Sequence, residues 1–198
     1  MTKEAERPAR RRPRRVVFAA TTVAAILTLS CSVAAAAGKG STTDTVHARG
    51  DQTRGLVVLD FIPGNGAPPI PAGCWATPDI AIVSTSGNAV LHTTVNKAGD
   101  FWLTTTYTGD AAVYPVAQPV TVDDNGNVIV DTSHDPLYTG HLTTWFGEED
   151  NNKNGVQHAT ASFNGSAPNG AAVTLHAHIQ YGTNAHGDPT ATNATATC

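Results

Sequence analysis

From residue 55 onward, apolar and polar residues alternate with a period of two, which is typical of β-strands that bury one face. No later stretch shows the 3.6-residue period of an amphipathic helix. The pattern predicts about ten short strands, rich in Thr and Val, at residues 56–62, 79–85, 89–95, 101–107, 120–122, 128–130, 137–146, 156–163, 171–181 and 190–197.

Turn signals separate these strands and set the fold class. A Pro/Gly-rich loop covers residues 63–73, and residues 96–100 and 123–127 form hairpin connections, the second of them with Asn125-Gly126 at its centre. Many short strands with such turns predict an all-β fold. We expect residues 55–198 to form a single antiparallel β-sandwich, immunoglobulin-like or jelly-roll-like.

The N-terminal segment has a different organisation. Basic residues 7–15 precede the apolar stretch 16–29, and the small residues 32–38 offer a cleavage site near Ala37. This order predicts a secretory signal peptide over residues 1–37 and a secreted protein without a membrane span after processing. The alternative is a lipid anchor at Cys31 on the cell surface, and Arg14-Arg15 leaves twin-arginine export open. The composition suggests a bacterial source.

Residues 38–54 contain almost no apolar side chains, so we expect a flexible linker between the leader and the domain. The leader holds 7 of the 12 basic residues and 2 of the 16 acidic ones, which leaves 5 against 14 and a formal charge of −9. A domain with this charge repels phosphate backbones, so we do not expect nucleic acid as a partner.

Removing the leader also removes Cys31 and leaves two cysteines, Cys74 and Cys198. In an oxidising compartment a remaining pair of cysteines is most simply a disulfide. We therefore predict one Cys74–Cys198 bond.

Three C-terminal strands can be placed in register from the centres of their loops, with His158 facing His176 and Trp145 facing His158. Alternation then predicts a core face formed by Leu142, Phe146, Ala159, Ala161, Phe163, Val173, Leu175, Ala177, Ile179 and Tyr181. The opposite, polar face carries His141, Thr143, Trp145, His158, Thr160, Thr174, His176 and His178.

The polar face allows three interpretations. As a ligand platform, Trp145 stacks on an apolar ring face while His141, His158, His176 and His178 hydrogen-bond to polar substituents, as expected for a glycan or cell-surface component. As a metal site, His158, His176 and His178 bind zinc or copper through neutral imidazole. The third interpretation is an ordinary solvent-exposed sheet face.

The sequence carries no Gly-x-Ser-x-Gly elbow, no His-Glu-x-x-His pair and no phosphate-binding glycine loop. The expected function is therefore that of a secreted, non-catalytic binding or cell-surface interaction module without a cofactor. The alternative is a metal-binding protein or metalloenzyme that uses the histidine cluster with zinc or copper.

Overall fold

The computed structural model describes residues 40–61, 74–75, 79–117, 119, 121, 128–151, 153–186 and 189–198. The predicted signal peptide with Cys31, the loop 63–73 and the turn 123–127 lie outside the described residues. A backbone hydrogen bond of 2.8 Å from Ile129 N to Thr121 O joins the two segments that flank that turn. No helix long and apolar enough to cross a membrane is found within the described part of the chain.

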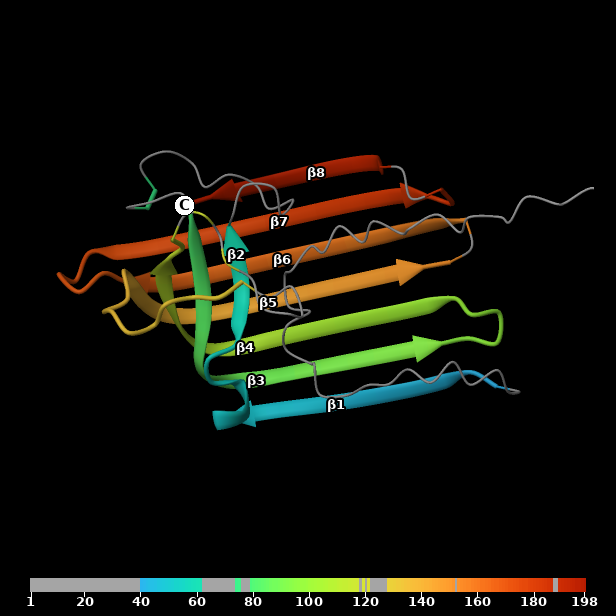
Figure 1. Cartoon of the computed structure of the whole chain (residues 1–198), viewed down its shortest axis with the longest axis horizontal. Coiled ribbons are helices and arrows are strands. Elements are labelled where there is room, and N and C mark those ends of the chain that lie inside the picture. Colours follow the sequence, from blue (N-terminus) through green and yellow to red (C-terminus); the bar gives the residue numbers. More distant parts are fainter. Residues whose placement is uncertain are drawn as a thin grey trace, which may run out of the picture.

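The described residues form eight antiparallel strands in one hydrogen-bonded sheet, with order β1-β3-β4-β5-β6-β7-β8 and β2 paired to β3 (Figure 1). The strands are β1 (Thr42–Gly50), β2 (Val57–Phe61), β3 (Ile80–Val95), β4 (Phe101–Pro115), β5 (Tyr138–Asp150), β6 (Asn154–Ser166), β7 (Ala172–Asn184) and β8 (Pro189–Thr197). A single 3-10 turn, η2 (Asp51–Thr53), joins β1 to β2.

The all-β antiparallel class is confirmed, but several of the described strands are longer than predicted. The two predicted strands 79–85 and 89–95 are one strand, β3, and the strand predicted at 101–107 continues to Pro115 as β4. A β-bulge at Ser84–Ser86, at the end of the first of these predicted strands, bends β3 without ending it. The described strands make one sheet and not the two sheets of a sandwich.

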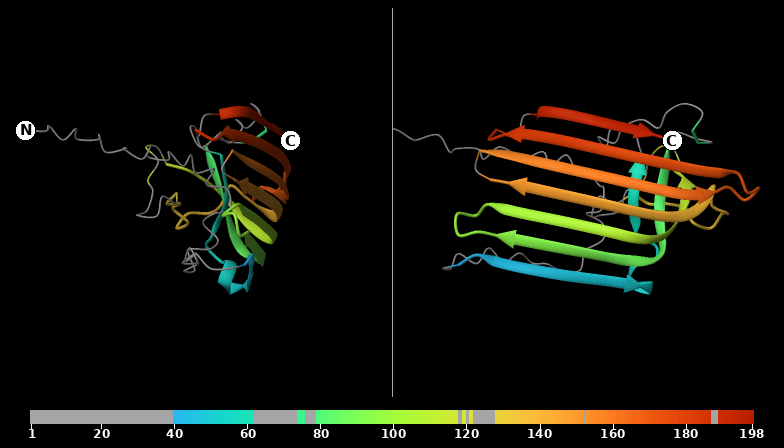
Figure 2. Two further views of the ribbon diagram at one scale, coloured as in Figure 1. Left: turned by 90° about the vertical axis from the view of Figure 1, so that its right-hand side faces the viewer. Right: turned by 180° about the vertical axis from the view of Figure 1, so that it is seen from behind.

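Instead, one part of the sheet folds over another part. β2 and the first residues of β3 run across the direction of the other strands and lie against one face of the sheet (Figures 1 and 2). At the bend, Gly109 of β4 pairs with Gly87 of β3. A Cβ at Gly109 would collide with the Ser86 carbonyl and the Gly87 Cα, so the two backbones approach each other closely at this point. Glycine therefore permits the bend that brings the second layer over the first.

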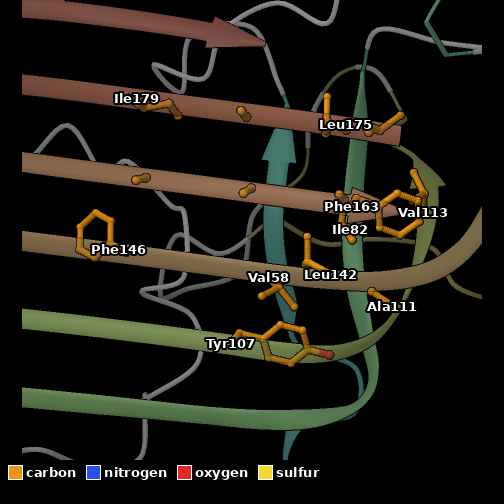
Figure 3. Packing of buried hydrophobic residues seen from close by; sticks show 14 of the residues in the cluster. Val58, Ile82, Tyr107, Ala111, Val113, Leu142, Phe146, Phe163, Leu175 and Ile179 are labelled. Atoms are coloured by element: carbon orange, nitrogen blue, oxygen red, sulfur yellow. The ribbon is translucent and has the colours of Figure 1, made fainter. Parts of the chain in front are cut away.

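The core lies between these two layers. Val58 of β2 and Ile82 of β3 pack onto Leu142, Phe163 and Leu175 of the long strands (Figure 3). All five side chains are fully buried. Each contributes about 1.5–3 kcal/mol by leaving water, which makes this contact the main source of stability at the covered end of the sheet.

Tyr107 fixes the bend from inside the core. Its hydroxyl donates a 2.9 Å hydrogen bond to the Asp110 carbonyl and shares a 2.7 Å hydrogen bond with Ser84 Oγ at the β3 bulge. Burial raises the pKa of the phenol above its ordinary value of 10.0, the hydrogen bond with Ser84 lowers the pKa, and the charge of Asp110 raises it. A single buried side chain thus links the bent parts of β3 and β4.

The structure differs from the predicted flexible linker. Within residues 38–54, Thr42–Gly50 form β1, which pairs with β3 from Thr42↔Val95 to Gly50↔Gly87. Its cross-strand contacts are polar, as between Thr45 Oγ1 and His92 Nδ1 at 2.8 Å. Hydropathy alone missed β1 because it is an edge strand with Ala48 as its only buried residue.

The Cys74–Cys198 disulfide is confirmed, with a Cα–Cα distance of 5.9 Å and a sequence separation of 124 residues. It holds the segment of Trp75 against the sheet, where the indole is 8% exposed. The Trp75 ring packs edge-on against Tyr138 at 5.0 Å and tilted against Phe163 at 5.7 Å between centroids. The bond therefore connects the end of β8 to the aromatic part of the core.

Candidate binding face

The sheet has one face opposite the core, and none of the described strands covers it (Figure 2). We call it the outer face. It consists of alternate residues 43–49 of β1, 88–94 of β3, 102–110 of β4, 141–149 of β5, 156–164 of β6, 174–180 of β7 and 193–197 of β8.

The predicted division of side chains between the two faces agrees with the burial. Nine of the ten residues predicted for the core face are buried, and Tyr181 is half-buried. The predicted polar residues of β5, β6 and β7 all lie on the outer face, where His141, Trp145 and His176 are exposed and His158 and His178 are half-buried.

The predicted cross-strand partners are wrong. Trp145 pairs with Thr160, not with His158, and His158 pairs with Gln180, not with His176. The loop between β6 and β7 is centred two residues later than expected, because Ala167 N bonds to Ala171 O around Asn169. The resulting changes of register are even numbers of residues, so every side chain stays on its predicted face.

The observed register separates the three predicted metal ligands. His176 and His178 follow each other on β7, while His158 lies on β6 opposite Gln180, diagonally from His178. Diagonal neighbours lie about 7–8 Å apart, farther than the directly facing pair that the sequence predicted. No group of three or more His, Cys, Asp or Glu side chains in the described ranges is placed to hold a metal ion.

The Trp145 indole lies flat along its own strand. A Cβ added at Gly147 would come within 2.6 Å of Cη2 and 2.8 Å of Cζ2 of that ring. Gly147 pairs with Thr104 on one side and with His158 on the other. Because the Trp145 ring covers Gly147, the cross-strand partner of His158, the ring extends toward His158 although Trp145 and His158 are not paired.

Trp102 is a second exposed aromatic residue on the outer face, and the sequence interpretation missed it. It lies on β4 opposite Glu149 and is 36% exposed, against 39% for Trp145. It is a diagonal neighbour of Gly147, over which the Trp145 ring lies, so the two indoles share one region of the sheet. The β4–β5 pairing was not predictable from a loop centre, because 22 residues (116–137) connect these strands.

His141 lies at the other end of β5. Its Nε2 is 3.2 Å from Thr108 Oγ1 and its Nδ1 is 3.7 Å from Asp110 Oδ1. Asp110 and His141 also border a shallow hollow of about 360 Å³, lined by Thr85, Asp110, Ala111, Thr139, Gly140 and His141. The order carboxylate, imidazole and hydroxyl is that of a hydrolase triad, but Asp110 is 75% exposed and too far from the ring for a hydrogen bond. The group orients His141 at the rim of the hollow.

Two further polar segments do not add a site. Glu148 and Glu149 point to opposite faces of β5, and Glu148 accepts a 3.1 Å hydrogen bond from Gln157 Nε2. His134 Nε2 lies 3.6 Å from Asp131, and both side chains are largely exposed. The first contact is a partly buried cross-strand pair between β5 and β6, and the second is an exposed contact between neighbours in sequence, so both are accounted for by local structure.

The outer face is long enough for an extended ligand. From Trp102 to Asp110 the β4 strand rises about 26 Å, and the seven strands from β1 to β8 span about 29 Å. Its remaining positions are mainly Thr, Ser and Asn, and several hydroxyls are already held in place, as in the 3.4 Å contact between Thr108 and Thr143. The surface combines two indoles with a field of hydrogen-bonding groups.

The chain was also compared with models of protein families, with curated proteins and with solved structures, and none of the three comparisons found a match.

Proposed function

We propose that the protein is a non-catalytic binding module whose outer face binds an extended carbohydrate chain. The observation that carries this proposal is the placement of Trp102 and Trp145, both exposed, in one region of an otherwise polar sheet face. A pyranose ring has an apolar face of C–H groups and a polar rim of hydroxyls. An indole packs on the first, and Thr, Asn and His side chains bond to the second.

The geometry also supports a ligand of several units. Trp102 and the hollow beside His141 lie at opposite ends of the outer face, and Thr104, Thr106 and Thr108 follow β4 between them. A small molecule would contact only one of these regions. A polymer of sugar rings can contact the indoles and the hydroxyl groups together.

The proposed site of action is outside the cytoplasm. The leader over residues 1–37 has the layout of an export signal, and the Cys74–Cys198 disulfide is compatible with an oxidising compartment. A surface or medium polysaccharide is then the class of partner that this module meets.

A binding role suits the outer face better than catalysis does. General acid–base groups usually sit in a cleft that excludes water, where burial and neighbours tune them. Asp110 and His141 instead lie largely in solvent, 75% and 57% exposed. Water screens their interaction, and the hollow beside them is shallow.

The test is affinity electrophoresis of the purified domain in native gels that contain one polysaccharide each, from a panel of cellulose, xylan, mannan, chitin and pectin derivatives. We expect retardation by at least one polymer. Trp102→Ala and Trp145→Ala should each weaken that binding about tenfold or more, since buried aromatic anchors dominate such contacts. Ile129→Ala, which removes an exposed apolar side chain outside the strands, is the control and should change nothing. Equal binding by all variants, or no retardation by any polymer, would contradict the proposal.

A further inference from the structure

Histidines are concentrated on the outer face. Six of the eight histidines of the chain lie there, at positions 47, 92, 141, 158, 176 and 178. The other two, His134 and His186, lie in segments between strands. Strands β1, β3, β5 and β6 carry one outer-face histidine each, and β7 carries two.

Few other charged groups accompany these histidines. The outer-face charges are Arg49 on β1, Asp110 on β4 and Glu149 on β5, while β3, β6, β7 and β8 contribute none besides histidine. Asp110 neighbours His141, and Glu149 lies diagonally from His158. With neutral imidazoles the face carries one guanidinium and two carboxylates, a formal charge of −1. Six protonated imidazoles bring it to +5.

His176 and His178 have the least compensation. Their cross-strand partners are Ser162 and Thr197 for the first, and Thr160 and Thr195 for the second. None of these neighbours bears a negative charge. Among the described strands, an imidazolium at either position therefore has no carboxylate side chain as its cross-strand partner, and it remains available to an anion from outside.

We propose that the ligand of the outer face is an acidic polysaccharide, one with carboxylates on its sugar rings, and that it binds in mildly acidic medium. This inference rests on the proposed carbohydrate binding and adds the charge of the ligand. Imidazole ordinarily gains a proton near pH 6.5, whereas a sugar carboxylate keeps its charge down to about pH 4. Between these values the outer face and the polymer attract each other, although the domain as a whole is acidic.

Above pH 7 the same face is slightly negative and repels the polymer, so binding is coupled to pH. The two indoles contribute equally at both pH values, since neither titrates. The histidines thus determine when an acidic chain binds, and the tryptophans determine that the chain is a carbohydrate.

The test compares two polymers with the same ring. Polygalacturonate carries free carboxylates, and fully methyl-esterified pectin carries none. We expect polygalacturonate to bind at least tenfold more tightly at pH 5.0 than at pH 7.5, and the ester to change less than twofold. Added salt at 0.5 M should weaken only the polygalacturonate complex.

Two double variants with equal changes of charge provide the control. His176→Gln/His178→Gln should lose most of the pH effect, since glutamine keeps a hydrogen-bonding side chain but not the proton. His134→Gln/His186→Gln should keep the effect. Equal behaviour of the two variants, or pH-independent binding of both polymers, would overturn the acidic ligand and leave carbohydrate binding intact. No binding of polygalacturonate at pH 5.0 would also overturn it. Failure of every polymer in the panel would instead overturn the proposed function.

Discussion

Trp145 covers Gly147, two residues further along β5, so closely that a Cβ at the glycine would lie 2.6 Å from the indole. A glycine within a strand ordinarily weakens it, and an aromatic side chain laid across it restores the lost packing. On the outer face this arrangement also fixes the orientation of the ring. Trp145 therefore presents a flat surface without a supporting pocket.

Gly147→Ala should displace the Trp145 ring, because the atoms in conflict belong to the movable end of an exposed side chain. We expect a change of less than about 1 kcal/mol in unfolding free energy, since alanine loses less backbone entropy on folding than glycine does. In a Trp102→Phe background, acrylamide quenching of tryptophan emission should increase and polysaccharide binding should fall. Gly40→Ala, with no atom within 4 Å of the new Cβ, is the matched control. Unchanged quenching in Gly147→Ala would contradict the stacking.

Tyr107 should make stability sensitive to alkaline pH. Its pKa is raised in the folded state, mainly by burial, so the folded protein holds the phenol proton more tightly than the unfolded chain does. Its contribution to stability is then complete below about pH 10 and falls as pH rises from there through the raised pKa. Tyr107→Phe should cost about 1–2 kcal/mol at pH 7, because the buried Ser84 hydroxyl loses its partner.

Urea unfolding at pH 7, 9, 10 and 11 measures this difference. The gap in unfolding free energy between the wild type and Tyr107→Phe should narrow above pH 10. A gap that stays constant to pH 11 would show that the phenol is not buried at the bend.

The Cys74–Cys198 bond should contribute strongly to stability, because it closes a loop of more than one hundred residues. In the loop-entropy picture the double variant Cys74→Ser/Cys198→Ser loses about 2–5 kcal/mol of unfolding free energy. Chemical denaturation with and without a reducing agent measures the effect. The reductant should destabilise the wild type and leave the double variant unchanged, and equal midpoints for both proteins without reductant would refute the prediction.

β1 should be protected against hydrogen exchange although its sequence resembles a linker. Its backbone pairs with β3 over nine residues, and ladder hydrogen bonds slow exchange. Mass spectrometry of peptides from residues 42–50 should show slow exchange of the ladder amides in the native domain. Complete exchange within the dead time, as expected for a flexible segment, would remove β1 from the sheet.

The sequence contained enough information to separate the two faces of β5, β6 and β7, because alternation of Leu142, Phe163 and Leu175 with polar neighbours depends only on the period of a strand. The sequence did not determine which residues of these strands pair with one another. Loop centres were misjudged by one or two residues, and an even shift exchanges the partners of His158 and His176 without moving either to the core.

The remaining differences arise from contacts distant in sequence. β1 is a strand because it pairs with residues some forty positions later, as Thr45 with His92, and nothing local indicates that partner. Trp102 joins the outer face of Trp145 through the β4–β5 pairing, whose connection is too long to predict. At the bend, where Gly87 pairs with Gly109, the apolar alternation of β3 is interrupted although the strand continues. Hydropathy therefore predicts two strands where the structure has one.

The most direct test of the account is a footprint of the bound polysaccharide. Hydroxyl-radical labelling with mass spectrometry, with and without the polymer that retards the domain most, reports which exposed side chains the ligand covers. We predict protection of Trp102, Trp145 and His176 on the outer face, with no change at Ile129 outside the strands. Labelling of both tryptophans that remains unchanged while the domain is saturated with ligand would contradict the assignment of the outer face as the binding site.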